Sequence, residues 1–337
     1  MSKKIAINGF GRIGKAFLRT IMQDPNTQNK LSVVAINIGP SNPESLANFF
    51  CYDSTLGKFK GSVSYENKKL TINSHSSHTI EIVTEPDPTK LPWGKLNIDF
   101  VVEASGLFTT REKAAAHLKS GAKKVLVTAP AQNEDITIIP GVNDNQYDAN
   151  KHAIISLGSC TTNCFAPMVK VLKSNFTLQQ GFMTTVHAYT NNQALLDSEH
   201  EDPRRGRAAA INIIPTNTGA SKVITKIYPD LEGRLLGSAL RVPVAVVSLV
   251  DFTFTTDEQL SASSINQAFE HAAQNDLKDI LQVTKEPLVS SDFIGSPYSC
   301  IIDSPLTNAC GTMGKISGWY DNEFGYSMRL KDFLLHI

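Results

Sequence analysis

Cysteine is scarce in this sequence, and its placement excludes several classes of protein. Five cysteines in 337 residues do not make a disulfide framework. None of them lies in a CxxC pair, so we predict no metal site. No segment reaches the ~20 apolar residues that span a bilayer, and the start of the chain lacks the apolar core of a secretory signal. We therefore expect a cytoplasmic protein with no membrane partner.

The sequence also has no excess charge of either sign. Lys and Arg together number 32 and Asp and Glu number 32, so the formal net charge is zero. This balance does not favour nucleic acid as a primary partner. Hydrophobic residues make up 41% and charged residues 19% of the chain, which is an ordinary globular composition. The length predicts about two domains.

A glycine-rich turn is the first motif along the chain. An apolar strand is predicted over residues 4–8, the sequence Gly-Phe-Gly-Arg-Ile-Gly follows at 9–14, and a helix is predicted over 15–22. Strand, GxGxxG and helix in this order indicate dinucleotide binding, because the glycines let the backbone approach a pyrophosphate at a helix N-terminus. The alternative is a glycine-rich turn that serves packing only.

The next predicted strand, residues 31–37, ends without the acidic residue that usually binds the adenine ribose. Asn37 and Ile38 stand there, and the first acid is Glu44. The missing carboxylate removes a repulsion against a 2′-phosphate, but no Arg or Lys takes its place. The choice between NAD and NADP is therefore open.

The two halves of the chain differ in their predicted elements. In the first half, strands at 98–104 and 124–128 flank a helix at 110–120, which favours a parallel, doubly wound sheet. In the second half, strands are predicted at 181–187, 240–254, 280–284 and 310–320, with helices at 166–175 and 261–275 and a final helix over 322–337. Such a run of strands predicts a mainly antiparallel sheet.

Residues 159–164, Ser-Cys-Thr-Thr-Asn-Cys, carry the candidate nucleophile. Cys160 follows an apolar strand at 153–157 and is expected at a helix N-terminus, where the helix dipole favours the thiolate. The alternative is a small buried apolar side chain. His187 ends a predicted strand 27 positions later and is the candidate base; a structural histidine is its alternative.

Beyond these motifs, the whole chain resembles the phosphorylating glyceraldehyde-3-phosphate dehydrogenases. The resemblance lies in residues 8–14, 159–164, 187–191, 204–210, 213–220, 241–243, 287–293 and 319–323. It implies an α/β Rossmann-type cofactor domain over 1–158, joined by the C-terminal helix 323–337, and an α+β catalytic domain with a mainly antiparallel sheet over 159–322. It also implies a homotetramer that acts in glycolysis or gluconeogenesis.

The resemblance further implies a mechanism. Cys160 attacks the aldehyde of glyceraldehyde 3-phosphate, and His187 takes the proton, pairs with the thiolate and stabilises the oxyanion. Hydride transfer to NAD, with NADP as the alternative, leaves a thioester. Inorganic phosphate then releases 1,3-bisphosphoglycerate.

Two sets of binding residues complete the prediction. The cofactor-binding candidates are Asn8, Gly9, Phe10, Gly11, Arg12, Ile13, Gly14, Asn37, Ser105, Gly106, Thr128, Asn322 and Tyr326. The resemblance assigns Ser159, Thr161, Thr218 and Gly219 to the attacking phosphate, and Thr190, Arg205 and Arg241, together with Asn192, to the substrate's own phosphate.

Three departures from the family pattern bear on these assignments. Ile38 replaces the ribose-binding acid. Asn192 stands where the family usually has Asp, which puts the organisation of Arg241 in question. Residues 197–200 read Asp-Ser-Glu-His instead of an apolar residue and Pro. The alternatives to the predicted function are an erythrose-4-phosphate dehydrogenase on the same scaffold and a non-enzymatic nucleotide-binding interaction protein.

Overall fold

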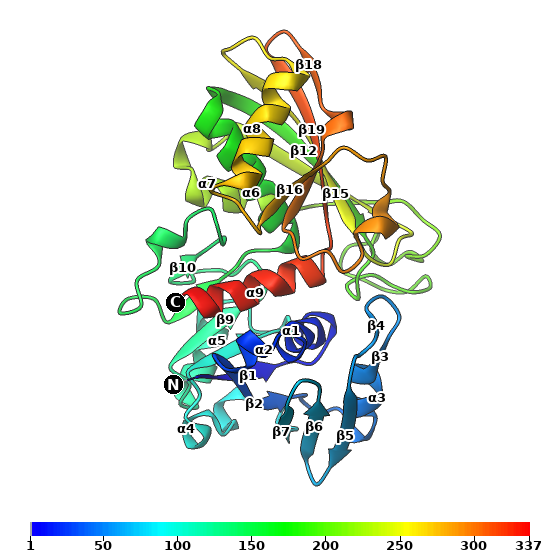
Figure 1. Ribbon diagram of the computed structural model, residues 1–337. Coiled ribbons are helices and arrows are strands. Elements are labelled where there is room, and N and C mark those ends of the chain that lie inside the picture. Colours follow the sequence, from blue (N-terminus) through cyan, green and yellow to red (C-terminus); the bar gives the residue numbers. More distant parts are fainter. Residues whose placement is uncertain (1) are drawn as a thin grey trace. The chain divides into compact units, whose positions relative to one another are not determined.

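The computed structural model describes residues 2–337, and the chain divides into two compact units (Figure 1). The first unit comprises the residues up to Ile138, Asp144–Gly158 and Ser327–Ile337. The second comprises Ile139–Asn143 and Ser159–Tyr326. Residues 139–143 and 323–326 thus group with the second unit, whereas the predicted ranges place them with the first.

A nine-stranded sheet forms the centre of the first unit, in the order β10-β11-β9-β8-β1-β2-β7-β6-β5. Neighbours from β10 to β7 pair in parallel, and β7, β6 and β5 pair antiparallel. The strands are β1 (Lys3–Asn8), β2 (Leu31–Asn37), β5 (Ser62–Glu66), β6 (Lys69–Asn73), β7 (Ser77–Val83), β8 (Phe100–Glu103), β9 (Lys124–Val127), β10 (Ile136–Thr137) and β11 (Ile154–Ser156). A separate ribbon joins β3 (Tyr52–Asp53) and β4 (Gly57–Lys58).

The predicted parallel sheet is confirmed, and the antiparallel extension β5–β7 was not predicted. β8 is buried throughout, as expected for a parallel strand covered on both faces. β6 alternates between buried and more exposed positions, because one of its faces meets solvent. Short polar segments flank β6 in the sequence, and for this reason the alternation was not recognised as a strand.

Helices α1 (Arg12–Met22), α2 (Pro25–Gln28), α3 (Leu46–Cys51), α4 (Trp93–Leu96) and α5 (Arg111–Lys119) complete the first unit, together with most of α9 (Phe324–His336). α5 begins where Thr110 caps it by accepting from the Lys113 amide. α9 is anchored by Lys331, which contacts Asp24 at 3.3 Å, and by Lys3, whose ammonium donates to the Leu334 carbonyl. The final helix was predicted correctly.

The second unit contains a mainly antiparallel sheet in the order β13-β14-β12-β15-β19-β17-β16, with β18 beside β19. Among the strand pairs of this sheet within residues 2–337, β12–β14 and β16–β17 are parallel and the others are antiparallel. The strands are β12 (Leu178–Ala188), β13 (Ile214–Thr216), β14 (Leu235–Val242), β15 (Ser248–Thr256), β16 (Leu281–Thr284), β17 (Cys300–Asp303), β18 (Asn308–Cys310) and β19 (Met313–Tyr320). The predicted fold class is confirmed for both sheets.

Three helices cover one face of this second sheet (Figure 1). They are α6 (Cys160–Asn175), α7 (Ala220–Ile227) and α8 (Ala262–Gln274). Phe165 of α6 and Phe269 of α8 are fully buried and share one core with strand residues such as Phe252 and Ile316. Burial of a Phe side chain stabilises the fold by roughly 1.5–3 kcal/mol. This core fixes the first turn of α6 against the sheet.

Several predicted boundaries were wrong, each for a local reason. The strand predicted over 240–254 is two strands, which break at residues 243–247, where Val247 has φ of 71°. The strand predicted over 310–320 is a hairpin that turns at Gly311, where φ is 61°. The helix predicted from residue 166 begins at Cys160, because Ser159 and Thr162 form a capping box. α1 likewise begins at Arg12, three residues before its predicted start.

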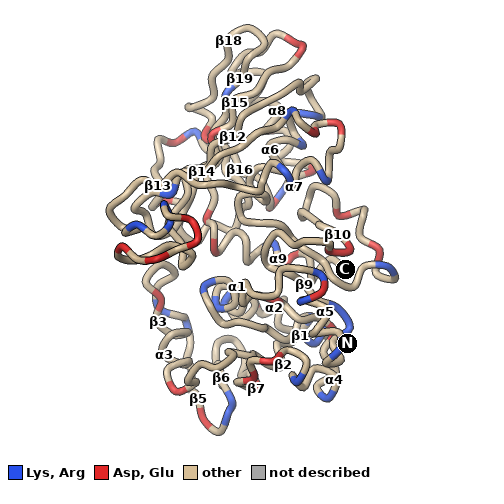
Figure 2. Tube along the Cα trace, turned by 180° about the vertical axis from the view of Figure 1, so that it is seen from behind, with Lys and Arg blue, Asp and Glu red and all other residues tan. Residues whose placement is uncertain are grey.

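Charged residues of both signs are dispersed along the trace (Figure 2). Within residues 2–337 no helix combines the length and the apolar character needed to cross a membrane.

Candidate active site

The glycine-rich turn between β1 and α1 is shaped for close backbone approach. Gly9 has φ of 95°, and a Cβ there would lie 2.5 Å from the Ser105 Cα. A Cβ on Gly14 would lie 2.3 Å from the Gly9 carbonyl oxygen. Gly11, by contrast, faces open space and precedes α1 without a side-chain cap. The turn therefore places a tightly packed backbone at the uncapped N-terminus of α1, which is the shape that a pyrophosphate site requires.

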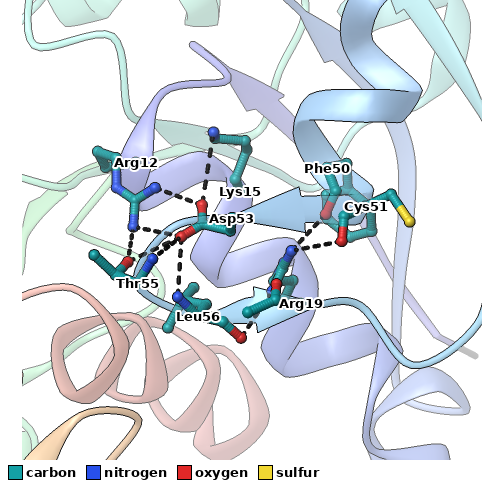
Figure 3. A network of polar contacts seen from close by, with 9 residues as sticks. Arg12, Lys15, Arg19, Phe50, Cys51, Asp53, Thr55 and Leu56 are labelled. Atoms are coloured by element: carbon teal, nitrogen blue, oxygen red, sulfur yellow. Dashed lines mark hydrogen bonds and ion pairs between the residues drawn. The ribbon is translucent and has the colours of Figure 1, made fainter.

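Arg12, in the first turn of α1, is held by an acid that the sequence did not single out (Figure 3). Asp53, on β3, accepts from the Arg12 guanidinium, and Lys15 lies 3.8 Å away. Burial opposes ionisation of Asp53, but hydrogen bonds from Arg12 and from the Leu56 and Thr55 amides outweigh it and hold the pKa of that carboxyl well below its usual range. Asp53 thus fixes two cations beside the glycine turn.

Asn37 stands at the end of β2, where a ribose-binding acid was sought. Its side-chain NH₂ donates to the Asn8 Oδ1 at 2.7 Å and to the Glu85 carbonyl at 2.9 Å. Its Oδ1 accepts from the Gly39 and Glu85 amides. All four hydrogen-bonding positions of this amide are engaged within the protein. A side-chain contact from Asn37 to a cofactor would require one of these bonds to break.

Asn8 continues this polar network into the sheet. Its amide donates to Glu103 Oε2 at 2.6 Å, and the other oxygen, Oε1, accepts from the backbone and hydroxyl of Ser105. His117 contacts Glu103 Oε2 at 2.9 Å and accepts from the Trp93 indole. Sequence analysis missed Glu103 and His117, although a carboxylate in an apolar strand was a visible signal.

Two further candidates of the first unit lie at strand ends. The Thr128 hydroxyl donates to the Glu103 carbonyl at 3.0 Å, and Gly106 adopts φ of 76°. Both follow strands of the parallel sheet at their carboxyl ends, the edge at which ligands bind in such sheets.

In the second unit the geometry brings the candidate nucleophile and base together. Cys160 is the first residue of α6, and its Sγ lies 3.4 Å from Nε2 of His187, near the end of β12. The imidazole is 5% exposed. Two residues separated by 27 positions therefore form a thiol–imidazole pair.

The protonation of this pair differs from the sequence-based expectation. Burial raises the pKa of the Cys160 thiol, although Arg241 and hydrogen bonds from Thr161 act to lower it. Burial, followed by the charge of Arg241, lowers the pKa of His187 to about 3. Desolvation is the largest influence on the Cys160 thiol, and it outweighs the hydrogen bonds from the first turn of α6, which act in the direction expected at a helix N-terminus. The neutral pair is favoured here.

The other imidazole nitrogen has competing partners. Nδ1 of His187 lies 2.7 Å from the Ala188 carbonyl and 2.5 Å from a guanidinium nitrogen of Arg241. The carbonyl requires a proton on Nδ1, whereas the guanidinium, which only donates, requires a lone pair there. With the proton on Nδ1, Nε2 is free to accept the thiol proton. The contact with Arg241 favours the opposite tautomer.

Arg241 and Arg205 form a cationic cluster on neighbouring elements. The charge of Arg205 lowers the pKa of Arg241 further, after burial, and Arg241 Nε is buried without a hydrogen-bond partner in the described chain. Arg205 donates to Asn192 Oδ1 at 2.5 Å and to the Thr216 hydroxyl at 2.9 Å. Asn192 thus contacts Arg205, whereas the family resemblance linked this position to Arg241. Such a cluster suits an anion with several oxygens.

The remaining predicted residues lie on elements of the same unit. The Ser159 hydroxyl caps α6 through the Thr162 amide. The Thr218 hydroxyl accepts from the Ala220 amide. Gly219 directly precedes α7, and a Cβ at this position would meet no atom within 4 Å. The Thr190 amide donates to the Gln193 side chain at 3.3 Å.

Asn322 and Tyr326 follow β19 and are both buried. The Ser248 hydroxyl accepts from the Ala188 amide at 3.1 Å and donates to Asn322 Oδ1 at 3.2 Å. The amide of Asn322 is therefore held with its oxygen toward Ser248. Sequence analysis missed Ser248, because nothing near it in sequence signals this contact.

A dinucleotide-shaped turn in one unit and a thiol–imidazole pair in the other are features of an NAD(P)-dependent dehydrogenase that acts on an aldehyde. Comparison with known families specifies this class. Residues 3–111 match the glyceraldehyde 3-phosphate dehydrogenase NAD binding domain, and residues 159–322 match the C-terminal domain of the same family. The chain belongs to the glyceraldehyde-3-phosphate dehydrogenase family.

Full-length relatives agree with this result. The chain is 48% identical to glyceraldehyde-3-phosphate dehydrogenase 1 of Bacillus subtilis, with 100% of this chain and 98% of the relative aligned. It is 48% identical to glyceraldehyde-3-phosphate dehydrogenase of Priestia megaterium, over 100% and 98% of the two chains. It is 46% identical to the enzyme of that name from Geobacillus stearothermophilus, again over 100% and 98%. The resemblance inferred from the sequence motifs is confirmed.

Proposed function

We propose that this chain oxidises and phosphorylates D-glyceraldehyde 3-phosphate to 1,3-bisphosphoglycerate, with NAD as cofactor and NADP as the alternative. The observation that carries the proposal is the 3.4 Å contact between Cys160 Sγ and His187 Nε2 in a chain that matches this family along both units. We assign residues 1–158 and 323–337 to cofactor binding and 159–322 to catalysis, in glycolysis or gluconeogenesis.

The first step joins the sulfur to the substrate. The Cys160 sulfur attacks the aldehyde carbon, the C=O π bond breaks, and the thiol proton passes to His187 Nε2. This transfer requires the tautomer in which Nδ1 donates to the Ala188 carbonyl, a contact of 2.7 Å. The imidazolium that results faces the new oxyanion and stabilises it.

A cofactor held at residues 8–14 supplies the hydride acceptor when it is bound. The imidazolium first returns its proton to the oxyanion, which gives the thiohemiacetal hydroxyl. His187 then takes this proton again as the carbon gives up its hydride and the thiohemiacetal becomes the thioester. Ser159, Thr161, Thr218 and Gly219 would hold the inorganic phosphate whose oxygen attacks the thioester carbon. The C–S bond then breaks, Cys160 leaves as the thiolate, and the imidazolium of His187 returns the proton to it. Thr190, Arg205 and Arg241 would bind the substrate's own phosphate, for which the cationic cluster supplies planar guanidinium donors.

We further propose that the chain acts as a homotetramer in the cytoplasm. Support for self-association comes from large apolar side chains that remain exposed in the second unit, among them Leu195, Leu196 and Ile211 at 75–78% exposure. Clustered exposed apolar residues are typical of protein interfaces.

The test is a steady-state assay of purified protein with glyceraldehyde 3-phosphate, inorganic phosphate and either NAD or NADP, followed by absorbance of the reduced cofactor. We expect turnover that requires phosphate, and Cys160→Ser should abolish it. D-Erythrose 4-phosphate in parallel tests the alternative substrate. Faster turnover of erythrose 4-phosphate, or unchanged activity of Cys160→Ser, would overturn the proposal.

A further inference from the structure

The parallel sheet of the first unit reverses its strand order between β1 and β8. From β1 the chain continues to β2 and β7 on one side, and later to β8, β9 and β11 on the other side. Such a switch point is the place at which open α/β sheets bind their ligands, beyond the carboxyl ends of the strands. Asn8 ends β1, Glu103 ends β8, and the two residues are paired across the switch point.

The carboxylate of Glu103 contacts both segments that shape the glycine-rich turn. Oε2 accepts from the side-chain amide of Asn8 at 2.6 Å, directly before Gly9. Oε1 accepts from the backbone N–H of Ser105 at 2.8 Å and from the Ser105 hydroxyl. Ser105 in turn lies against the glycine-rich turn, because a Cβ on Gly9 would be 2.5 Å from the Ser105 N and Cα. One side chain, 2% exposed, therefore joins the end of β1 to the loop that follows β8.

The donors of this network all point toward Glu103. On one side, Asn37 Oδ1 accepts from two backbone amides, so its NH₂ donates to Asn8 Oδ1 and the NH₂ of Asn8 donates to Glu103. On the other side, the Trp93 indole can only donate, so Nδ1 of His117 accepts and its Nε2 carries the proton that faces Glu103. Backbone amides and an indole cannot reverse these bonds. Residue 103 must therefore accept on both oxygens.

A glutamine at position 103 cannot satisfy this arrangement. Its amide nitrogen would face either the N–H of Ser105 or the protons of Asn8 and His117, and in both cases a buried donor is left without an acceptor. In the first case the loop at residues 104–106 loses its anchor, and in the second case the end of β1 does. Both segments flank Gly9, so either outcome disturbs the glycine-rich turn.

We propose that Glu103 is a positioning residue for the cofactor, and that its carboxylate holds residues 104–106 and the end of β1 at the spacing that the dinucleotide requires. Hydrogen bonds to a charged acceptor are stronger than neutral ones, and a binding site depends on residues that lock its contacting groups in place. The inference rests on the proposed function in taking residues 8–14 as the cofactor site.

The first test compares NAD binding by Glu103→Gln and His117→Leu, measured by isothermal titration calorimetry without glyceraldehyde 3-phosphate. We expect Glu103→Gln to bind NAD about tenfold more weakly, the factor that corresponds to the loss of one hydrogen bond to a charged group. Its KM for NAD should rise by a similar factor, while kcat at saturating NAD should fall much less. His117→Leu removes one partner of Oε2 and leaves the bonds to Ser105 and Asn8 in place, so it should bind NAD like the wild type although it is less stable. This matched control separates positioning from a general loss of stability.

The second test needs no cofactor. The Ser105 amide donates to Glu103, and the Leu107 amide donates to the Ser105 hydroxyl. Hydrogen–deuterium exchange in peptides that cover residues 104–108 should therefore be faster in Glu103→Gln and unchanged in His117→Leu. Because no ligand is present, this result stands apart from the activity assay that tests the proposed function.

Two results would overturn the inference. One is wild-type affinity for NAD in Glu103→Gln, and the other is an equal loss of NAD affinity in Glu103→Gln and His117→Leu. If Glu103→Gln does not fold, Ser105→Ala removes only the hydroxyl donor to Oε1 and takes its place in both measurements. Faster exchange and weaker NAD binding in Ser105→Ala would support the positioning role, and wild-type values in both would refute it.

Discussion

Two buried histidines, one in each unit, show how the same side chain serves different ends. His117 is fully buried and has a donor and an acceptor that agree: the Trp93 indole donates to Nδ1, and Nε2 contacts Glu103 Oε2. His187 is 5% exposed, and its Nδ1 is approached by both a carbonyl and a guanidinium. One imidazole has a single favoured tautomer, and the other has two competing ones.

The difference follows from what surrounds each ring. Around His117 the carboxylate of Glu103 accepts four hydrogen bonds, so the polar network is complete and stabilises the carboxyl end of β8. Around His187 the cations are in excess, since Arg241 and Arg205 repel each other. A complete network stabilises the fold, whereas an incomplete one remains able to change protonation state or bind an anion.

The largest expected effect separates the two histidines by activity. His187→Asn should lower kcat about 10³-fold, because a general base contributes 10²–10⁴-fold, and the variant keeps a polar side chain near Cys160. Single-turnover kinetics with glyceraldehyde 3-phosphate measures the acylation rate directly. A kcat within tenfold of the wild type would remove His187 from the mechanism.

His117→Leu should show the reverse pattern. It leaves the Trp93 indole and the Glu103 carboxylate each without one partner, and breaking a buried charged contact costs about 3–5 kcal/mol. Chemical denaturation should show this loss of unfolding free energy, while kcat at saturating cofactor stays close to the wild type. His117→Gln, which can restore a donor, is the control and should lose less. Equal stability of the Leu variant would show that the network is dispensable.

The pH dependence of stability gives a third comparison. The pKa of His187 is lowered to about 3, first by burial and then by Arg241, whereas an unfolded histidine titrates near 6.5. Between these values the unfolded state binds a proton that the folded state does not, so the free energy of unfolding decreases as pH falls. From pH 7 to pH 5 this group should cost the wild type ~2 kcal/mol.

Denaturant titrations of the wild type and His187→Asn at both pH values test this. The wild type should lose ~2 kcal/mol more than the variant on going to pH 5. Parallel losses in the two proteins would mean that His187 accepts a proton in the folded state without penalty.

The sequence predicted those parts of the structure that depend on local pattern. The turn at residues 9–14, the alternation of parallel strands and helices in the first unit, and the position of Cys160 at a helix N-terminus all follow from neighbouring residues. The break between β14 and β15 could not be foreseen, because Val247 adopts a positive φ that only its surroundings stabilise.

The chemistry of the site was less accessible from sequence. The contact between the Thr161 and Tyr320 hydroxyls arises from folding, since the two residues are 159 positions apart. The favoured neutral state of Cys160 and His187 depends on desolvation, which only the three-dimensional packing determines. Residue identity therefore predicted which groups take part, and burial determines their charge.

The smallest expected effect comes from adding a carboxylate to the cationic cluster of Arg205 and Arg241, which offsets its excess positive charge. Asn192 accepts from Arg205 on the exposed side of the cationic cluster, so Asn192→Asp replaces a neutral acceptor with a charged one. An exposed pair of this kind stabilises by at most ~1 kcal/mol, which thermal unfolding would detect as a small rise in Tm. The added negative charge should also raise the KM for glyceraldehyde 3-phosphate two- to threefold at low salt, with the difference shrinking at high salt because exposed charges are screened. Asn191→Asp adds the same charge one residue away and is the control. If Asn192→Asp instead lowers the KM, the carboxylate improves the orientation of Arg205 more than it weakens the attraction for phosphate, and the incomplete network is not what favours anion binding.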